Sequence, residues 1–230
     1  MRMFLIPITI KMKIKNKNIH IKVCGMKHSD NIQAVATLDP DYMGFIFYEK
    51  SPRNFDAIIP KLPDTIKKTG VFVNAPFEFV LEKVARYHFK AIQLHGNEDI
   101  AYCTELRSRL DHNTSNTNVE LFKVFSIKDH FDFAALAPYE GVVDYFLFDT
   151  KGKEKGGNGY TFDWSVLKNY RSTTPIILSG GIGVDEIEKI QEILASDLPI
   201  YALDINSKFE DVPGLKNIEK LKLFMGLIEE

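Results

Sequence analysis

The chain has 230 residues, of which 45% are hydrophobic, and it carries a formal net charge of -2. This hydrophobic content can bury a substantial core in one large α/β domain or two small ones, so disorder is excluded as the main state. A net charge so close to zero creates no global basic field, which argues against nucleic acid or an anionic membrane as a partner. Any anionic ligand must therefore be bound by local groups.

Residues 1–18 form a predicted N-terminal extension. They combine an apolar run over residues 3–10 with five basic residues and no acidic one. The run is too short to span a bilayer. A signal peptide is an alternative, but Pro7 interrupts the run and no small-residue cleavage site follows. We expect residues 1–18 to be poorly ordered, with Met12 as an alternative start, and residues 19–230 to form the folded domain.

The first predicted strand covers residues 19–24 and ends on a cysteine. Ile21 and Val23 alternate with Lys22 and Cys24. Because side chains alternate between the two faces of a strand, Lys22 and Cys24 share one face. A lysine at that position is expected if the face lines a partly polar interior, such as the inside of a barrel, while the aliphatic face packs against helices.

A tight turn and a helix follow this strand. Gly25 allows the chain to leave the strand abruptly, and Ser29 is predicted to cap a helix over residues 31–38. The unit is therefore a strand, a loop and a helix. It places the Cys24 thiol at the carboxyl end of the strand.

Eight apolar runs along the chain are predicted to form strands. They cover residues 19–24, 42–48, 69–73, 91–95, 121–126, 145–149, 175–179 and 200–205. Helical patterns are clearest over residues 76–88, 98–110, 184–194 and 215–228. Divided among eight units, the chain after residue 18 provides about 26 residues per unit, close to the smallest complete (β/α)8 barrel. The predicted fold is α/β, a single (β/α)8 TIM barrel without a second domain.

An open doubly wound sheet is the competing fold. Such a sheet usually has five or six strands and often a glycine-rich turn after the first strand. Here the adjacent glycines, Gly180 and Gly181, follow the seventh predicted strand instead. Barrel enzymes commonly bind phosphate in the loops after strands seven and eight. This order of features favours the barrel.

Several predicted strands carry a polar residue at or next to their carboxyl end, which a purely structural barrel would not require. Four such residues are Cys24, His95, Asp149 and Asp204. Active sites of barrels lie on the carboxyl-terminal rim and take residues from several strands. Taken singly, each has a structural explanation, such as a buried hydrophobe for the cysteine or a helix cap for an aspartate. The four together favour an active site.

Two further features could bind anions. Arg53 follows Ser51 and Pro52 in a turn after the second strand, where it could clamp a carboxylate with two parallel bonds or remain a solvated charge. Backbone amides at the glycine turn of Gly180 and Gly181, and at a helix N-terminus, could form an anion cradle. Two adjacent glycines are weak evidence alone, because tight turns use them anyway.

The two cysteines, Cys24 and Cys103, are far apart and lack the spacing of metal ligands. Cys103 lies in a helical pattern where a small buried hydrophobe is expected. We therefore expect a reduced, cytoplasmic protein without a disulfide.

A series of motifs between Lys22 and Asn217 resembles a known family. In chain order they are KVCG, GFIFYEKSPR, GVFVN, IQLHG, LFDT, GGNGYTFDW, LSGGIG, LDINSKFE and PGLKN. Together they are similar to phosphoribosylanthranilate isomerase of tryptophan biosynthesis. The resemblance implies a (β/α)8 barrel that converts N-(5'-phosphoribosyl)anthranilate to 1-(2-carboxyphenylamino)-1-deoxyribulose 5-phosphate by an Amadori rearrangement. It implies no cofactor and no metal.

The resemblance also implies roles for individual residues. Cys24 of KVCG corresponds to the general base and Asp149 of LFDT to the general acid. Arg53 of SPR would hold the anthranilate carboxylate. The remaining positions match phosphate-binding turns, namely Gly180, Gly181, Asn206 and Ser207, or rim positions near the sugar, namely His95 and Asp204.

A thiol with an ordinary pKa of about 8.5 needs electropositive help to act as a base at neutral pH. Lys22 lies on the same strand face as Cys24, one layer below it. Closure of the barrel brings strand one against strand eight, and thus Asp204 close to Lys22. We expect Lys22 and Asp204 to pair and to set the field around Cys24; the alternative is that Lys22 is merely satisfied by buried carboxylates.

The chain departs from the family pattern in its eighth loop, where many relatives have Ser-Gly and this chain has Ser207-Lys208. We expect ordinary backbone geometry at Lys208, with its ammonium either on the substrate phosphate or, the favoured outcome, in solvent. Residues 151–159 are rich in lysine and glycine. They could form a closing lid or a solvated loop.

Two other functions stay open from the sequence. A phosphosugar isomerase of histidine biosynthesis would favour a second phosphate cradle after strands three and four, but residues 73–75 and 95–97 contain no glycine pair there. A non-catalytic binding barrel would have no reason to keep both Cys24 and Asp149. The expected partner is a small phosphosugar substrate that carries anthranilate, and we expect a monomer.

Overall fold

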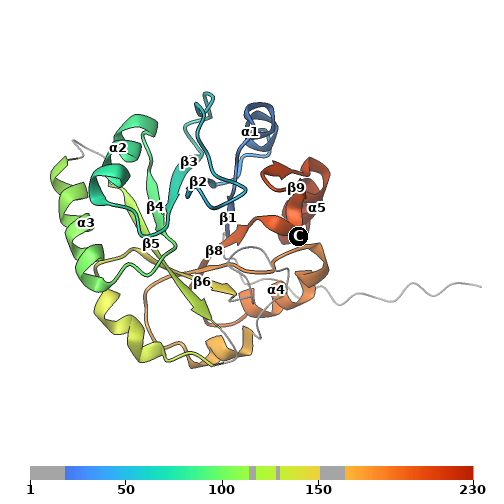
Figure 1. Ribbon diagram of the computed structural model, residues 1–230. Helices are drawn as coiled ribbons and strands as arrows, with labels where there is room; N and C mark the ends of the chain where they lie inside the picture. Colours follow the sequence, from blue (N-terminus) through green and yellow to red (C-terminus); the bar gives the residue numbers. More distant parts are fainter. Residues whose placement is uncertain (1–18, 114–117, 128–129, 151–163, 230) are drawn as a thin grey trace, which may run out of the picture.

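Eight parallel strands form a closed barrel in the computed structural model, which describes residues 19–113, 118–127, 130–150 and 164–229 (Figure 1). Each strand pairs with the next, and β1 closes the barrel against β8. The predicted N-terminal extension and the candidate lid at residues 151–159 lie outside the described residues.

The eight predicted strands are confirmed, with ends that shift by at most two residues. They are β1 His20–Val23, β2 Tyr42–Phe47, β3 Lys67–Phe72, β4 Ala91–Leu94, β5 Glu120–Ile127, β6 Tyr145–Thr150, β7 Ile176–Leu178 and β8 Ile200–Ile205. The alternation of side chains along each strand explains which residues face into the barrel and which face outward. Residues at alternate positions fill the inside of the barrel, and the intervening aliphatic residues face the surrounding helices.

Helices surround the barrel on the outside (Figure 1). The α-helices are α1 Ser29–Ala36, α2 Phe77–Tyr87, α3 Ile100–Asn113, α4 Ile187–Leu194 and α5 Ile218–Glu229, and the 3-10 helices are η1 Phe133–Tyr139, η2 Trp164–Asn169, η3 Val184–Glu186 and η4 Ser207–Phe209. The 48–66 connection between β2 and β3 contains no helix. Phe55 from this connection packs against Phe45 and Phe47 of β2 in place of one.

Two sequence predictions for the helices were wrong in detail. The N-cap position of α1 is His28 rather than Ser29, and no side chain caps the helix. Two hydrogen bonds between Asn31 and the backbone of Lys216 hold this first turn instead. The last helix begins at Ile218 and not at residue 215, because the preceding residues pair with β9.

A short antiparallel ribbon follows β8 and η4. It consists of β9, Glu210–Val212, and β10, Leu215–Lys216. The ribbon lies near the carboxyl end of β8 and beside α5 (Figure 1). It therefore brings two charged residues, Glu210 and Lys216, to the rim where the candidate site residues end.

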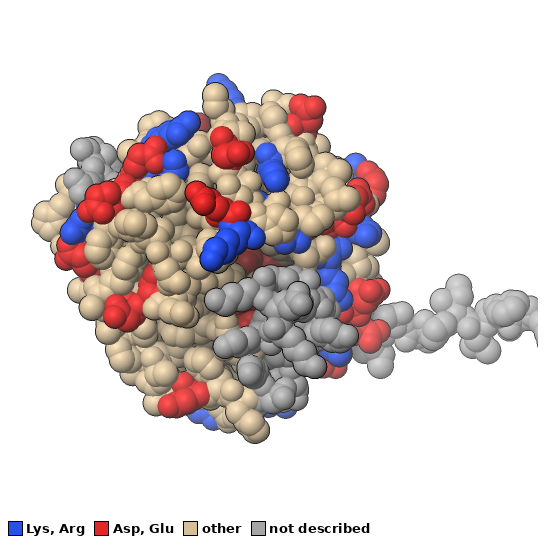
Figure 2. All heavy atoms as spheres, viewed as in Figure 1, with Lys and Arg blue, Asp and Glu red and all other residues tan. Residues whose placement is uncertain are grey.

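The face of the molecule seen in Figure 2 carries no strong charge of one sign among the described residues. On the face seen in Figure 2, acidic and basic side chains are interspersed, and neither forms a broad continuous patch. Within the described parts of the chain, no helix has both the length and the apolar character needed to cross a membrane.

Candidate active site

Cys24 follows β1 directly and lies in a tight environment. Its backbone N–H donates to the carbonyl oxygen of Ile205 at 2.9 Å, and only 3% of the residue is exposed. A Cβ atom built on Gly44 of β2 would lie 2.8 Å from the Cys24 Sγ and 3.2 Å from the Lys22 Nζ. The absence of a side chain at Gly44 therefore makes room for the thiol and for the lysine below it.

The predicted pair of Lys22 and Asp204 is confirmed. The two residues are register partners between β1 and β8, and the Lys22 Nζ donates to the Asp204 Oδ1 at 2.7 Å. The Ser179 hydroxyl donates to the other carboxylate oxygen at 3.2 Å. Burial alone would lower the pKa of Lys22, but Asp204 and then Cys24 raise it above its ordinary value. Lys22 is therefore a charged ammonium inside the barrel.

The Cys24 thiol experiences opposing influences. Burial is the largest, and it raises the pKa of Cys24; the Asp204 charge acts in the same direction. Lys22 and Lys216 lower the pKa, yet the net result is a pKa above the ordinary thiol value. Without a bound substrate, Cys24 is therefore protonated at neutral pH.

Asp149 lies in β6 and contacts His95, which follows β4. The His95 Nε2 is 3.4 Å from the Asp149 Oδ2. On the other side of the ring, the Gln93 Nε2 lies 2.8 Å from the His95 Nδ1. The His95 ring is therefore held between the Gln93 amide and the Asp149 carboxylate.

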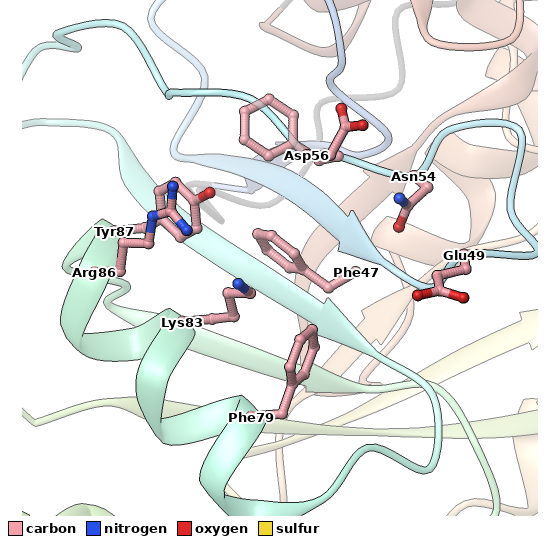
Figure 3. Close-up of a pocket in the computed structure, with 9 residues that line it drawn as sticks. Phe47, Glu49, Asn54, Asp56, Phe79, Lys83, Arg86 and Tyr87 are labelled. Atoms are coloured by element: carbon pink, nitrogen blue, oxygen red, sulfur yellow. The ribbon is translucent and has the colours of Figure 1, made fainter.

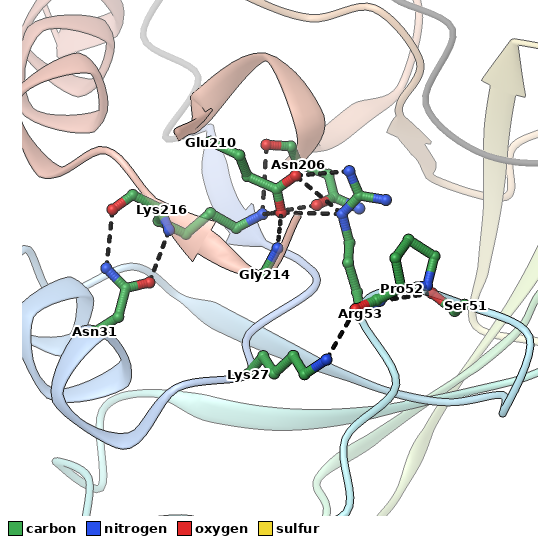
Figure 4. A network of polar contacts seen from close by, with 9 residues as sticks. All are labelled: Lys27, Asn31, Ser51, Pro52, Arg53, Asn206, Glu210, Gly214 and Lys216. Carbon is green, nitrogen blue, oxygen red and sulfur yellow. Dashed lines mark hydrogen bonds and ion pairs between the residues drawn. The ribbon is translucent and has the colours of Figure 1, made fainter. Parts of the chain in front are cut away.

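Arg53 lies over the β8 side of the barrel rim. Its Nε donates to both carboxylate oxygens of Glu210, at 2.9 and 3.0 Å, and its Nη2 donates to the Oε2 at 2.6 Å (Figure 4). The Lys216 Nζ contacts the same carboxylate at 2.7 Å and the Asn206 Oδ1 at 2.6 Å. Arg53 and Asn206 thus share one polar network, although they were predicted to bind different parts of the substrate.

The glycine turn after β7 has the geometry that only glycine adopts readily. Gly180 has φ +84° and Gly181 has φ +70°. The Ser179 backbone N–H donates to the Phe148 carbonyl oxygen at 2.8 Å, which anchors the turn to β6. Ser207 opens the short helix η4 at the end of the neighbouring strand. The two predicted phosphate turns therefore follow adjacent strands, β7 and β8.

Lys208 confirms one expectation and adds a contact that was not expected. It lies within η4, and it is not among the residues with positive φ, so its backbone geometry is ordinary. The favoured expectation of an ammonium in solvent was wrong, because the Lys208 ammonium donates to the Glu186 Oε1 at 2.9 Å. A Cβ atom on Gly183 would lie 3.0 Å from the Lys208 Cδ, so this glycine leaves space for the lysine stem. The ion pair joins the loops after β7 and β8.

A hollow on the outer face of the barrel lies apart from these residues. It is lined by Phe47, Glu49, Asn54, Phe55, Asp56, Phe79, Lys83, Arg86 and Tyr87. Figure 3 shows Lys83 between the rings of Phe47 and Phe79, whose centroids lie 5.8 and 4.9 Å from its Nζ. None of the predicted site residues lines the hollow. Because these residues gather at the carboxyl ends of the strands, we place the candidate site on that rim of the barrel.

Four residues near the site were not identified from the sequence: Gly44, Gln93, Glu210 and Lys216. All four lie inside the family motifs, in GFIFYEKSPR, IQLHG, LDINSKFE and PGLKN. The motifs could have pointed to them as candidates. Their contacts could not be predicted, because Arg53 and Glu210 are separated by 157 positions and meet only after the barrel has closed.

The closed barrel, with a thiol, carboxylates, an imidazole and an arginine at the carboxyl ends of its strands, defines the protein as a (β/α)8 barrel enzyme. The family model for N-(5'phosphoribosyl)anthranilate (PRA) isomerase matches residues 21–226. The chain belongs to this family, as the sequence motifs predicted.

Curated relatives and solved structures agree with this assignment. N-(5'-phosphoribosyl)anthranilate isomerase of Parabacteroides distasonis is 43% identical over 215 residues, covering 90% of this chain and 92% of the relative. The isomerase of Phocaeicola vulgatus is 36% identical, covering 91% and 98%. The crystal structure of the isomerase from Thermus thermophilus has a TM-score of 0.74 at 26% identity, covering 92% and 98%.

A further solved structure contains a bound ligand. It is a phosphoribosyl anthranilate isomerase in complex with reduced 1-(o-carboxyphenylamino)-1-deoxyribulose 5-phosphate. Its TM-score with this chain is 0.73 at 25% identity, covering 92% of this chain and 98% of that one.

Proposed function

We propose that this protein is an intramolecular isomerase of tryptophan biosynthesis. It converts N-(5'-phosphoribosyl)anthranilate to 1-(2-carboxyphenylamino)-1-deoxyribulose 5-phosphate by an Amadori rearrangement. The observation that carries the proposal is the family match over residues 21–226 of the barrel. The relative with a bound reduced carboxyphenylamino-deoxyribulose phosphate supports a phosphosugar as the substrate.

The first chemical step opens the sugar ring, and we assign it to Asp149. Protonation of the furanose ring oxygen lets the bond between this oxygen and C1 break, and the anilino nitrogen supplies the electron pair that forms a protonated imine. A carboxylic acid positioned at the ring oxygen contributes about 10²- to 10⁴-fold to such a step. His95, whose Nε2 lies 3.4 Å from the Asp149 Oδ2, can orient this carboxyl group.

The second step removes the proton from C2, and we assign it to Cys24. The thiolate takes this proton, the electron pair of the C–H bond forms the C1=C2 bond, and the imine nitrogen is neutralised. The resulting enolamine tautomerises to the ketone. Lys22 lowers the pKa of Cys24 without overcoming the effect of burial, and the positive imine nitrogen is the additional charge that favours the thiolate once the ring has opened.

The positions of Cys24 and Asp149 suit this division of labour. Cys24 follows β1 and Asp149 lies in β6, so β7 and β8 separate them around the barrel. A ring bound over the barrel axis can therefore meet an acid on one side and a base on another. This supports two different groups acting on two different substrate atoms.

The remaining predicted site residues serve substrate binding in this proposal. Arg53 holds the anthranilate carboxylate. His95 and Asp204 lie toward the sugar. The phosphate is held by the glycine turn after β7 and by the start of η4, that is by Gly180, Gly181, Asn206 and Ser207.

A substrate with two phosphates is disfavoured by the loops after β3 and β4. The backbone N–H groups of Asn74 and Gly96 both donate to the Glu98 carboxylate, at 2.7 and 2.9 Å. Lys123 neutralises that carboxylate at 2.9 Å. The amides that a second phosphate cradle would require are thus already used within the protein, and this argues against the histidine-pathway alternative.

We further propose that the enzyme works as a cytoplasmic monomer without cofactor or metal. Cys24 and Cys103 are both free thiols, which is consistent with a reducing compartment. Size-exclusion chromatography with light scattering measures the oligomeric state, and a dimer mass would contradict this part of the proposal.

Conversion of substrate to product tests the proposed function. Purified protein is mixed with N-(5'-phosphoribosyl)anthranilate after dialysis against EDTA, and the ketose product is identified by NMR. We expect stoichiometric conversion at a rate that EDTA leaves unchanged. No conversion would refute the proposed function, and loss of activity on EDTA treatment would refute the cofactor-free mechanism.

A further inference from the structure

Glu210 is the centre of a buried charge cluster at the carboxyl-terminal rim. It is the first residue of β9, and 4% of its side chain is exposed. Its carboxylate receives hydrogen bonds from Arg53, from the Lys216 ammonium and from the Gly214 backbone N–H (Figure 4). Such a carboxylate accepts from three directions, so little freedom remains for it to move.

The contacts of Glu210 use one particular edge of the Arg53 guanidinium. Nε and Nη2 form this edge, with distances of 2.6 to 3.0 Å to the carboxylate oxygens. The opposite edge consists of Nη1 and the second Nη2 proton, and among the described residues no hydrogen bond involves Nη1. A guanidinium is planar and can bind one carboxylate on each edge. Arg53 can therefore hold a second carboxylate in the plane that Glu210 fixes.

The backbone of the Arg53 turn is also fixed. The Arg53 N–H donates to the Ser51 Oγ at 3.2 Å, and the Lys27 ammonium donates to the Pro52 carbonyl oxygen at 2.9 Å. A Cβ on Gly25 would lie 2.8 Å from the Arg53 Cδ, so the arginine stem packs directly on the turn that follows Cys24. The stem and the guanidinium are thus held independently.

The charges of the cluster suit an anionic ligand. Arg53 and Lys216 both contact the Glu210 carboxylate, and no other carboxylate of the described residues contacts both. Burial is the largest influence on Lys216 and brings its pKa below the ordinary value, although the charge of Glu210 raises it. Burial alone would raise the pKa of Glu210, but the hydrogen bonds from Arg53 and the charge of Lys216 bring it below its ordinary value. Glu210 is therefore ionised, and it is shared between two basic side chains, so the cluster favours a carboxylate ligand at the remaining edge of Arg53.

From this cluster we infer that Glu210 is a positioning residue that fixes Arg53 for recognition of the substrate carboxylate. This inference rests on the proposed function and extends it. Glu210 does not contact the substrate. It acts through Arg53 by occupying one guanidinium edge, and the contact with Lys216 at 2.7 Å holds the Glu210 carboxylate in place.

A double-mutant cycle on Arg53 and Glu210 tests this. Arg53→Ala and Glu210→Gln should each raise KM about tenfold or more, since each removes or misplaces a charge-assisted hydrogen-bonded contact, and kcat should change much less. If Glu210 acts through Arg53, the double variant should be no worse in KM than Arg53→Ala alone. Losses that multiply in the double variant would overturn the inference.

A carboxylate-free ligand separates positioning from a general structural effect. Binding of ribulose 5-phosphate, measured by competition with the substrate, should be the same in wild type and Glu210→Gln because this ligand does not use Arg53. Equal weakening of ribulose 5-phosphate and of the reduced carboxyphenylamino analogue would show that Glu210 supports the whole rim, and would overturn the inference.

Two further variants protect the test against misfolding. Glu210→Asp keeps a carboxylate beside Lys216, but its shorter side chain no longer reaches Arg53 fully, so this variant should also raise KM. It serves as the test if Glu210→Gln does not fold. An unchanged KM in Glu210→Asp would contradict the inference. Glu120→Gln is the matched control, because Glu120 is an ion-paired glutamate at the opposite end of the barrel, 2.6 Å from the Lys67 Nζ. It should leave KM unchanged.

The rate of the wild-type enzyme separates failure of the proposed function from failure of the role assigned to Glu210. Absence of turnover by the wild-type enzyme refutes the proposed function itself. Turnover by the wild type together with a multiplicative cycle refutes only the role of Glu210.

Discussion

Burial and charge act in opposite directions on the Cys24 thiol. Burial raises its pKa, and Lys22 lowers it from one layer below. The residue that acts as base in the proposed mechanism therefore depends on a lysine that cannot itself reach solvent, since Lys22 is fully buried. The balance between these influences decides at what pH a thiolate is available.

Removal of the Lys22 charge should shift the titration of Cys24 upward. In Lys22→Met, the pH midpoint for alkylation of Cys24 by iodoacetamide should move to higher pH, because an opposing positive charge is lost. The measurement is made in a Cys103→Ala background, although burial already raises the pKa of Cys103 to about 11. An alkylation profile identical to that of the parent would exclude Lys22 from the account.

A second variant controls for the buried partner. Lys22→Met leaves Asp204 charged and unpaired inside the barrel, which destabilises the fold by about 3–5 kcal/mol. Lys22→Met/Asp204→Asn removes both charges, and Asp204 raises the pKa of Cys24 while Lys22 lowers it. The alkylation midpoint of the double variant should therefore lie between those of the parent and the single variant.

At the scale of one element, the close approach of β2 to Cys24 limits which residue can stand at position 44. Gly44 of β2 faces Cys24, and a Cβ there would also lie 3.2 Å from the Cys24 Cα. This backbone atom cannot rotate away as a side chain could. The strand pairing of β1 and β2 thus leaves no room for a larger residue.

Gly44→Ala should destabilise the protein by about 1–3 kcal/mol, since an overpacked site must shift backbone or side chains. Gly226→Ala is the matched control, because Gly226 lies in α5 and a Cβ there meets no atom within 4 Å. The control should stabilise by about 0.5–1 kcal/mol through helix propensity. Urea unfolding measures both, and equal effects of the two changes would refute the contact argument.

A buried ion pair joins the connections on the β3, β4 and β5 side of the barrel. The Lys123 Nζ lies 2.9 Å from the Glu98 Oε2, with 4% and 1% of the two side chains exposed. Glu98 also accepts from the backbone of Asn74 and Gly96, next to His95. The pair therefore holds the loop from which His95 extends.

Glu98→Gln should lower the free energy of unfolding by about 3–5 kcal/mol, because Lys123 is left as an uncompensated buried charge. The exposed pair of Glu219 and Lys222, at 3.0 Å, offers a control, and Glu219→Gln should change stability by less than about 1 kcal/mol. Thermal and urea unfolding give both values. A Glu98→Gln effect as small as that of the control would contradict the stabilising role of the buried pair.

The sequence predicted elements well where the pattern is local. Apolar runs identified all eight strands, and Lys22 on the Cys24 face of β1 already indicated a barrel interior. Prediction failed where distant segments decide local structure. Residues 215–216 read as the start of a helix, but pairing with β9 makes them a strand, and Asn31 anchors α1 where Ser29 was expected to cap it.

The distinction between local patterns and contacts of distant segments also applies to the candidate site. Motifs pointed to Cys24, Arg53 and Asp149 as candidates, because each stands in a short family motif at a strand end or in the turn that follows it. They did not predict that Glu210 fixes Arg53 or that Glu186 pairs with Lys208, since these partners meet only through the closure of the barrel.

At the scale of the whole molecule, the two ends of the barrel differ in the role of their polar residues. At the amino-terminal end, Tyr42, Glu120, Lys67 and Tyr201 form a closed network of hydrogen bonds among strand beginnings. At the carboxyl-terminal end, the charges surround the candidate site instead. This separation agrees with the general organisation of barrel enzymes, in which one rim stabilises and the other carries the chemistry.

The central claim is that Cys24 and Asp149 perform proton transfers in the isomerisation. The most direct measurement follows the loss of N-(5'-phosphoribosyl)anthranilate fluorescence at saturating substrate for wild type, Cys24→Ser and Asp149→Asn, with thermal unfolding as a check of the fold. Each variant should retain less than about a tenth of the wild-type kcat, below the low end of an acid or base contribution, while substrate affinity and thermal stability change little. A folded variant that keeps more than about a tenth of the wild-type rate would contradict the role assigned to that residue.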